Sequence, residues 1–374
     1  NEDIQDFLYT TFYKYGTADA SYQFGDEFVR TLRGDGVDPG IKWEETSSLN
    51  FGIDFGFWDN RISGTVDVYQ KNTNDLLFTV VTSAFTNLSD RILSNIGEME
   101  NKGIELSLNS VILDRKNLQW DLGFNASYNQ NKITKLDNNS AEQLANFQGY
   151  ETGGISGDVG QNIQILKVGQ SVETFNTYKH ILLEDGKPVP DTYDRDGNGI
   201  LNLLDMYEDL NEDGLINEND LTVNQSAAPD FIFGLSTNLQ YKNWDFTAVI
   251  RSHIGNYVYN NVSSSTGYFE RLTDRVTNNI DASAYKVHFK TKQLKSDYYI
   301  ENASFAKLDN ITIGYNIQKA GFLESVRIFA TVSNVFTLTN YSGLDPELPQ
   351  FMGGIDNNIY PVSRNILLGL NINF

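Results

Sequence analysis

The feature that most constrains this chain is a strict period-two alternation of apolar and polar residues. It is clearest at the C-terminus, where Ile366, Leu368, Leu370, Ile372 and Phe374 fall on one side of an extended chain and Asn365, Gly369, Asn371 and Asn373 on the other. Successive side chains of a β-strand point to opposite faces. The pattern therefore predicts strands with one apolar and one polar face.

The same alternation recurs along the chain, for example at Phe231–Tyr241, Leu118–Tyr128 and Leu49–Phe57. From it we predict ten strands, near residues 6–14, 49–57, 62–70, 101–111, 118–129, 231–241, 244–254, 304–317, 325–337 and 362–374.

The connections between these strands alternate between short and long. Tight turns at 58–61, 114–117, 242–243 and near 320–321 separate long loops near 16–48, 71–100, 130–230, 255–303 and 338–361. Outer-membrane barrels combine short periplasmic turns with long extracellular loops. We therefore predict an all-β, antiparallel, multi-pass transmembrane β-barrel over residues 1–374, with its outer face against outer-membrane lipid and its C-terminus in the periplasm.

Aromatic residues flank the tight turns, as at Phe57, Trp58, Tyr241 and Trp244. Such rings suit a membrane interface, because one part is apolar and the other polar. A soluble β-sandwich also has alternating strands, but its loops have no reason to be long at one end only.

Composition excludes several classes of protein. We find no apolar run of the ~20 residues that a membrane-spanning helix needs. There is no cysteine, so neither a disulfide framework nor a thiolate metal site can form. The net charge of −21 argues against binding to nucleic acid, which needs clustered Lys and Arg. Because the sequence starts at Asn1 without an apolar leader, we expect a processed protein or an internal piece of a longer chain.

Several stretches, in order along nearly the whole chain, resemble the SusC/RagA-type TonB-dependent transporters of the outer membrane. They are Ile41–Glu45 with Leu49–Phe55, Asn95–Leu106, Asp209–Asp220, Ala303–Tyr315, Ser333–Phe336, Tyr341–Pro346 and the terminal strand ending at Phe374.

This resemblance implies nutrient import of oligosaccharides or peptides, a SusD-type lipoprotein over the outer mouth, and energy from TonB. It also implies a barrel of about 22 strands with a plug domain, and we find no plug or TonB box here. We therefore expect the ten strands to form a curved open wall, which the remainder of the barrel completes. A closed barrel of ten strands is the alternative, since lipid does not tolerate an unpaired strand edge.

Two tandem segments have the ligand spacing of EF-hand calcium loops, with oxygen-bearing side chains at positions 1, 3, 5, 9 and 12 and glycine at position 6. With the backbone carbonyl of position 7, the candidate ligands are Asp194, Asp196, Asn198, Ile200, Asn202 and Asp205 in the first loop and Asp209, Asn211, Asp213, Leu215, Asn217 and Asp220 in the second. The sequence thus predicts Ca²⁺ sites, although Asp replaces the usual bidentate Glu at position 12. The alternative is an acidic loop that is merely well solvated.

No catalytic set stands out. An outer-membrane barrel protease or lipase would need a histidine beside an acid, and His180 with Glu184 or Asp185 is the candidate. A passive porin is a further alternative. Six aromatic residues of the long loops could stack on a substrate or pack the loops together: Phe147, Tyr150, Tyr257, Tyr259, Tyr268 and Phe269. The sequence does not indicate which substrate is imported.

Overall fold

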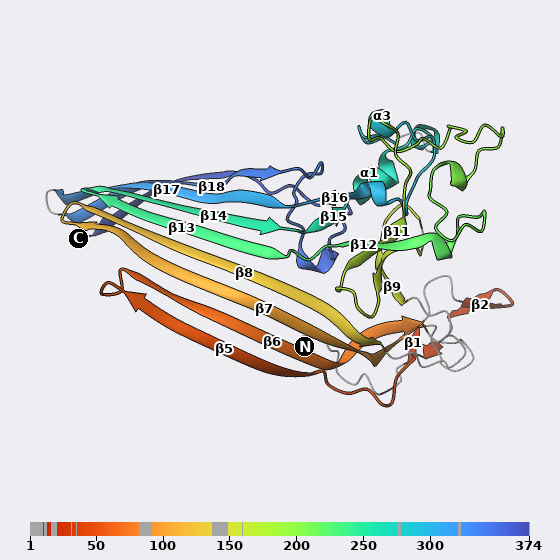
Figure 1. Cartoon of the computed structure of the whole chain (residues 1–374), viewed down its shortest axis with the longest axis horizontal. Helices are drawn as coiled ribbons and strands as arrows, with labels where there is room; N and C mark the ends of the chain where they lie inside the picture. The colour runs from red at the N-terminus through yellow and green to blue at the C-terminus, as the bar shows by residue number, and fades with distance from the viewer. Residues whose placement is uncertain are drawn as a thin grey trace.

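The computed structural model describes residues 10, 13–15, 21–30, 32–34, 36–81, 91–136, 149–158, 160–274, 278–320 and 323–373. One antiparallel sheet of nine strands, which we call the wall, dominates these residues (Figure 1). Its spatial order is β19-β18-β17-β14-β13-β8-β7-β6-β5. The strands are β5 (Glu45–Phe57), β6 (Ile62–Val81), β7 (Arg91–Arg115), β8 (Leu118–Leu136), β13 (Phe231–Tyr241), β14 (Trp244–Ile254), β17 (Phe305–Ala320), β18 (Leu323–Thr339) and β19 (Asn365–Asn373).

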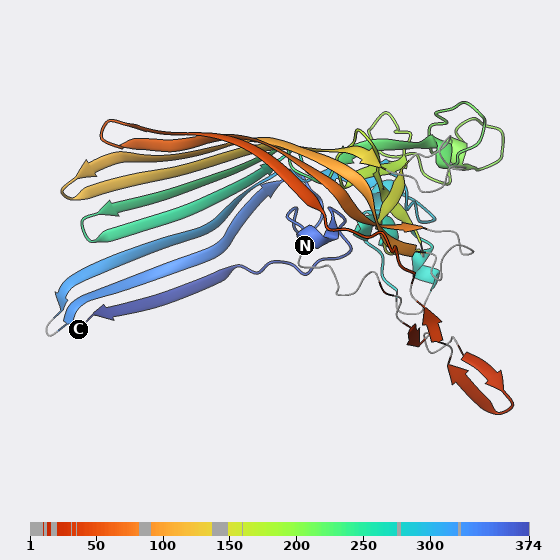
Figure 2. The same cartoon turned by 90° about the horizontal axis from the view of Figure 1, so that it is seen from below.

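Nine of the ten predicted strands are confirmed as strands of this wall. The first, 6–14, lies mostly outside the described residues. Its end falls in β1 (Tyr13–Tyr15), which pairs with β4 (Leu32–Gly34) and not with the wall. Among the described residues β19 pairs only with β18, and β5 only with β6. The described chain is therefore a curved open sheet, as Figure 2 shows.

The prediction of a long loop over residues 71–100 is wrong for most of its length. β6 continues to Val81 and β7 begins at Arg91, and the two strands stay paired up to Val81 and Arg91. Sequence reasoning missed this extension because the pairing slips near Leu76, which interrupts the alternation.

The short turns lie together at one end of the wall and the long connections at the other (Figures 1 and 2). The C-terminus lies at the end with the short turns. The predicted asymmetry of the connections is therefore confirmed.

Strand register carries the apolar residues across all nine strands on one face. One row of directly paired residues runs Phe51, Val68, Ile104, Tyr128, Phe231 and Ile254. A second runs Leu370, Ile328, Tyr315, Trp244 and Tyr241. Most of these side chains are exposed, Leu368 to 79%. Their exposure fits a face that contacts lipid, and the even-numbered residues of β19 lie on it; Phe374 lies outside the described residues.

The long connections build a second unit at the other end of the wall. We call residues 149–158, 160–226, 257–274 and 278–302 the outer lobe. It contains a four-stranded sheet in the order β12-β11-β10-β9 and the pair β15-β16. Its elements are β9 (Tyr150–Gly154), β10 (Asn162–Leu166), β11 (Thr174–Tyr178), η1 (Leu203–Asp205), η2 (Glu218–Asp220), β12 (Leu221–Ser226), β15 (Tyr257–Tyr259), α1 (Asn261–Thr266), α2 (Arg271–Asp274), α3 (Ala284–Val287), η3 (Asp297–Tyr299) and β16 (Ile300–Asn302).

A compact apolar core holds the outer lobe together. Ile163, Phe175, Tyr259 and Phe289 are fully buried in it, and Ile355 joins it from the β18–β19 connection. The prediction of a folded region within 130–230 is confirmed for the described residues. A separate hairpin, β2 (Ser21–Phe24) with β3 (Glu27–Arg30), precedes the wall. Among the described residues no helix is long and apolar enough to cross a membrane.

Candidate functional site

The face of the wall opposite the apolar rows is polar. Asn125, Ser236, Thr247, Asn310 and Thr312 lie on it, at positions that alternate with the apolar rows. Amides and hydroxyls both donate and accept hydrogen bonds, so this face can solvate a neutral polar solute.

Glycines on the polar face each lie opposite a larger residue in the neighbouring strand, and that side chain covers them. The pairs are Gly52 with Asp67, Gly103 with Tyr69, Gly123 with Ser236, Gly234 with Asn125, Gly314 with Asp245 and Gly369 with Phe329. A methyl group at any of these glycines would overlap its partner. The covering side chains therefore lie along the wall rather than project from it.

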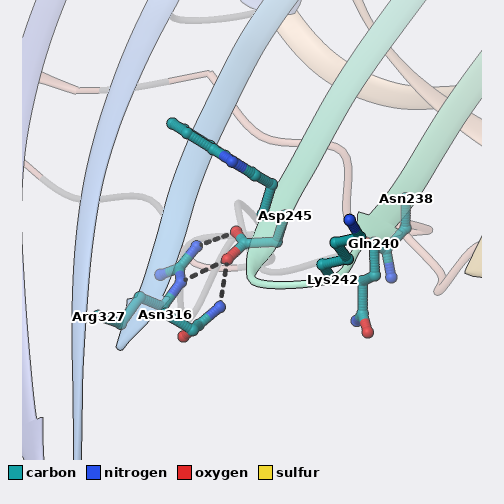
Figure 3. Close-up of a pocket in the computed structure, with 7 residues that line it drawn as sticks. Asn238, Gln240, Lys242, Asp245, Asn316 and Arg327 are labelled. Carbon is teal, nitrogen blue, oxygen red and sulfur yellow. Dashed lines mark hydrogen bonds and ion pairs between the residues drawn. The ribbon is translucent and has the colours of Figure 1, made fainter. Parts of the chain in front are cut away.

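A hollow of about 350 Å³ opens on the polar face near the turn at Lys242 (Figure 3). Asp245 accepts hydrogen bonds from Arg327 Nε (3.0 Å) and Nη2 (2.5 Å) and from Asn316 Nδ2 (2.9 Å). Asn238 and Gln240 lie beside this group. It is a satisfied polar network that joins β14, β17 and β18, and it contains no nucleophile–base pair.

The two acidic loops have matching geometry. Asp194 accepts hydrogen bonds from the backbone N–H groups of Gly197 and Gly199, as Asp209 does from Asp213 and Gly214. The backbone bends with positive φ at both Gly199 and Gly214, the sixth position of each loop.

Position 12 also has the same role in both loops. Asp205 accepts from the N–H groups of Arg195 and Asn202, and Asp220 from those of Leu210 and Asn217. Each thereby closes a capping box on a short 3₁₀ helix. Hydrogen bonds from the backbone of Asn202 lower the pKa of Asp205, so that this carboxylate stays charged.

In the first loop the structure brings three acids together. Carboxylate oxygens of Asp194, Asp196 and Asp205 lie within 4.8 Å of one another. The amides compete for the same oxygens, since Asn198 Nδ2 donates to Asp196 and Asn202 Nδ2 to the Ile200 carbonyl. In the second loop Asn211 Nδ2 donates to Asp213 in the same way. A hard cation would need these amides to present oxygen instead.

The structure does not bring His180 together with Glu184 or Asp185, so the proposed histidine–acid pair is wrong. The ring bonds Ser296 Oγ and the Val189 carbonyl, both at 2.9 Å. Asp185 instead pairs with Lys187. Because both His180 and Ser296 are buried, this serine–histidine contact is closed to a substrate. Burial lowers the pKa of His180 to about 4, so the ring is neutral.

The loop aromatics divide as the second interpretation predicted. Tyr259 and Tyr268 are buried in the core of the outer lobe, and Tyr257 packs against it. Phe269 packs edge-on against Tyr285. Phe147 lies outside the described residues. These rings therefore serve mainly to hold the outer lobe together.

Sequence reasoning missed a charged cluster where the wall meets the connection between β18 and β19. It consists of Arg251, Lys307 and Asp309 from the wall and Asp345 and Glu347 from that connection. The available signal was three charged residues at polar-facing positions near the long-loop ends of β14 and β17.

Comparison with known proteins identifies the family. The sequence profile described as "TonB dependent receptor-like, beta-barrel" matches residues 5–335. TonB-dependent receptor SusC of Bacteroides thetaiotaomicron is 35% identical over 99% of this chain, and TonB-dependent receptor P3 of Formosa agariphila is 28% identical over 94%. The chain belongs to the TonB-dependent receptor β-barrel family, an outer-membrane family, and the resemblance noted from the sequence is confirmed.

A solved structure, that of the RagAB peptide transporter, shares the fold. It superposes with a TM-score of 0.74 at 22% identity over 100% of this chain and 40% of that chain. This chain spans 36% of the length of SusC and 36% of that of P3.

Proposed function

We propose that this chain is the wall of a TonB-dependent outer-membrane importer for oligosaccharides or peptides. The observation that carries the proposal is the two-faced nine-strand sheet of this family, apolar on one side and lined by amides and hydroxyls on the other. The polar face borders the path of the solute, and the apolar face contacts outer-membrane lipid. Lipid excludes an open edge, so the remainder of the barrel pairs with β5 and β19.

The partners follow from the same proposal. A SusD-type lipoprotein covers the outer lobe, and TonB acts through a plug carried outside these residues. The SusC likeness and the shared fold of RagAB support this assembly. Affinity purification of the tagged full-length protein from membranes should recover a lipoprotein in a fixed ratio; recovery of the barrel alone would contradict it.

The test of import uses the full-length protein in its own bacterium. Deleting the gene should abolish uptake of one substrate among a panel of labelled neutral oligosaccharides and short peptides, and the intact gene should restore it. Collapse of the proton gradient should stop uptake in the complemented strain. Uptake that persists without the gradient would indicate a passive porin. Cleavage of the panel by the purified protein would indicate a barrel protease or lipase instead.

Orientation is part of the proposal: the outer lobe is extracellular and the C-terminus periplasmic. The common end of the short turns supports it. Protease added to intact cells should cut the acidic loops and spare the turn at Lys242. Cleavage at that turn in sealed cells would reverse the topology.

We also propose that the two acidic loops bind Ca²⁺. The tandem EF-hand spacing and the convergence of Asp194, Asp196 and Asp205 support it. Thermal unfolding of the full-length protein should shift upward with Ca²⁺ and return with chelator. The double variant Asp194→Asn/Asp209→Asn should lose the shift, whereas Asp185→Asn, an exposed acid outside both loops, should keep it. An equal shift in all three proteins would rule out a site in these loops.

A further inference from the structure

The connection between β18 and β19, residues 340–364, touches both units of the molecule, and we call it the last loop. On the wall side, Glu347 Oε1 accepts from Arg251 Nη1 at 2.6 Å and Glu347 Oε2 from Lys307 Nζ at 2.8 Å. Asp345 lies 3.4 Å from the same ammonium group. Glu347 therefore binds two cations on two neighbouring strands.

Burial and charge make this contact stable. The side chain of Lys307 is 5% exposed, so its charge has little water and depends on Asp345 and Glu347. Burial raises the pKa of Glu347, but the hydrogen bonds from Arg251 and Lys307 outweigh it and lower that pKa to about 2. The cluster therefore stays ionised throughout the ordinary pH range.

The wall is shaped to receive the last loop. Pairing between β14 and β17 shifts register at Asp309, which has no partner of its own, and Asp309 bonds Arg251. Bulges re-aim side chains at a chosen point of a strand. Here the bulge places an acid that orients the Arg251 guanidinium towards Glu347.

On the other side, the last loop is built into the outer lobe. Gly354 O accepts from the Tyr259 N–H and the Asp356 N–H donates to Tyr259 O, at 2.9 and 3.0 Å. Gly353 O accepts from Gln164 Nε2 of β10 at 2.6 Å. Ile355 is 3% exposed within the lobe core.

The two sides are joined inside the last loop itself. Tyr341 donates to Asp356 Oδ2 at 2.7 Å, and both residues are buried. This bond ties the start of the last loop, next to the wall anchor, to the stretch that enters the lobe core. Figure 2 shows the last loop lying where the wall meets the outer lobe.

We propose that the last loop is a rigid link that fixes the position of the outer lobe on the wall, with Glu347 as the residue on which the link depends. A load on the lobe, such as a docked partner, is thereby passed to β14 and β17 on the polar face. The outer lobe has a second attachment, in which Asn131 Oδ1 of β8 accepts from the Val172 N–H at 2.8 Å. With β8 holding one point and the last loop another, the lobe cannot pivot.

The test measures lobe position and lobe folding separately in the full-length protein in nanodiscs. Spin labels are placed at cysteines introduced at Tyr193 in the lobe and Asn74 in β6, both exposed. This stretch has no cysteine of its own, and any cysteine elsewhere in the full-length chain is first replaced. Lys307→Met and Glu347→Gln remove one partner of the anchor, Lys307→Arg keeps the charge, and Glu324→Gln is a control at the far end of β18.

Lys307→Met and Glu347→Gln should broaden the distance distribution and speed amide exchange in residues 341–356 by on the order of tenfold or more. Exchange of Ile163 and Ile165 in β10 should stay slow, and Lys307→Arg and Glu324→Gln should match the parent. An unchanged distribution in the first two variants would overturn the proposal. So would exposure of β10 in them, because the cluster would then support lobe folding rather than lobe position.

Discussion

The wall and the outer lobe bury apolar surface in opposite ways. The lobe encloses its apolar side chains in a core whose members come from β10, β11, β15 and the loops between them. No wall strand contributes to that cluster, and the wall instead exposes Leu49, Phe51, Ile366 and Leu368. One chain thus contains a unit stabilised by its own packing and a unit whose apolar face needs lipid.

The difference explains why stability has two separate origins here. In the lobe, a lost side chain leaves a cavity that its neighbours feel. In the wall, the backbone ladder and the covered glycines hold the sheet, and the outer side chains matter for their transfer into lipid. Substitutions should therefore act differently according to the surrounding medium.

The largest expected effect is in the lobe core. Phe289→Ala should destabilise the lobe by about 3–5 kcal/mol, because the ring is fully buried among apolar neighbours. Denaturant unfolding followed by a lobe-specific probe measures it, and the loss should be the same in detergent and in lipid. A loss seen only in lipid would mean that the lobe has no independent core.

The wall should show the converse dependence. Leu235 lies on the apolar face at the middle of β13, and Leu235→Arg should cost about 2–4 kcal/mol in a bilayer. Ser236→Arg, one residue along and on the polar face, is the matched control and should cost much less. Equal costs for the two would contradict the assignment of the faces, and refolding into vesicles of defined lipid provides the measurement.

A pH titration should separate the two units further. His180 is neutral in the folded lobe with a pKa of about 4, against 6.5 for the free side chain. The unfolded chain takes up the proton first, so lobe stability is lost as pH falls from about 6.5 towards 4, by at most about 3 kcal/mol. Asp297, whose pKa is raised by burial, works in the opposite direction and reduces this loss.

Lobe unfolding between pH 7 and pH 4 measures the effect of His180. His180→Asn should remove most of the slope, since asparagine can bond Ser296 without titrating in this range. The same slope in the variant would assign it to another group.

The sequence predicted the wall well and the lobe poorly, for a physical reason. Wall strands carry their structure locally, because alternation sets the faces and short turns set the order, as in Phe231–Tyr241 with Trp244–Ile254. The acidic loops were also found, since ligand spacing is a local pattern. The anchor was not, because Arg251 and Glu347 are 96 residues apart and meet only through the fold. The core role of Tyr259 and the burial of His180 depend on similar long-range packing.

The smallest effect contrasts a glycine in each unit. In the wall, Gly369 lies opposite Phe329, and a methyl group there would overlap the ring. Gly369→Ala should therefore cost about 1–3 kcal/mol as the ring is pushed off the sheet. In the lobe, Gly154 of β9 has no atom closer than 3.6 Å to the added carbon. Gly154→Ala should be neutral or stabilising by about 0.4–1 kcal/mol, since it restricts the unfolded chain. The variant Gly369→Ala/Phe329→Ala should recover the steric part of the loss, because the overlapping ring is gone. If Gly369→Ala proved as harmless as Gly154→Ala, the covered glycines would not be what holds polar side chains against the wall.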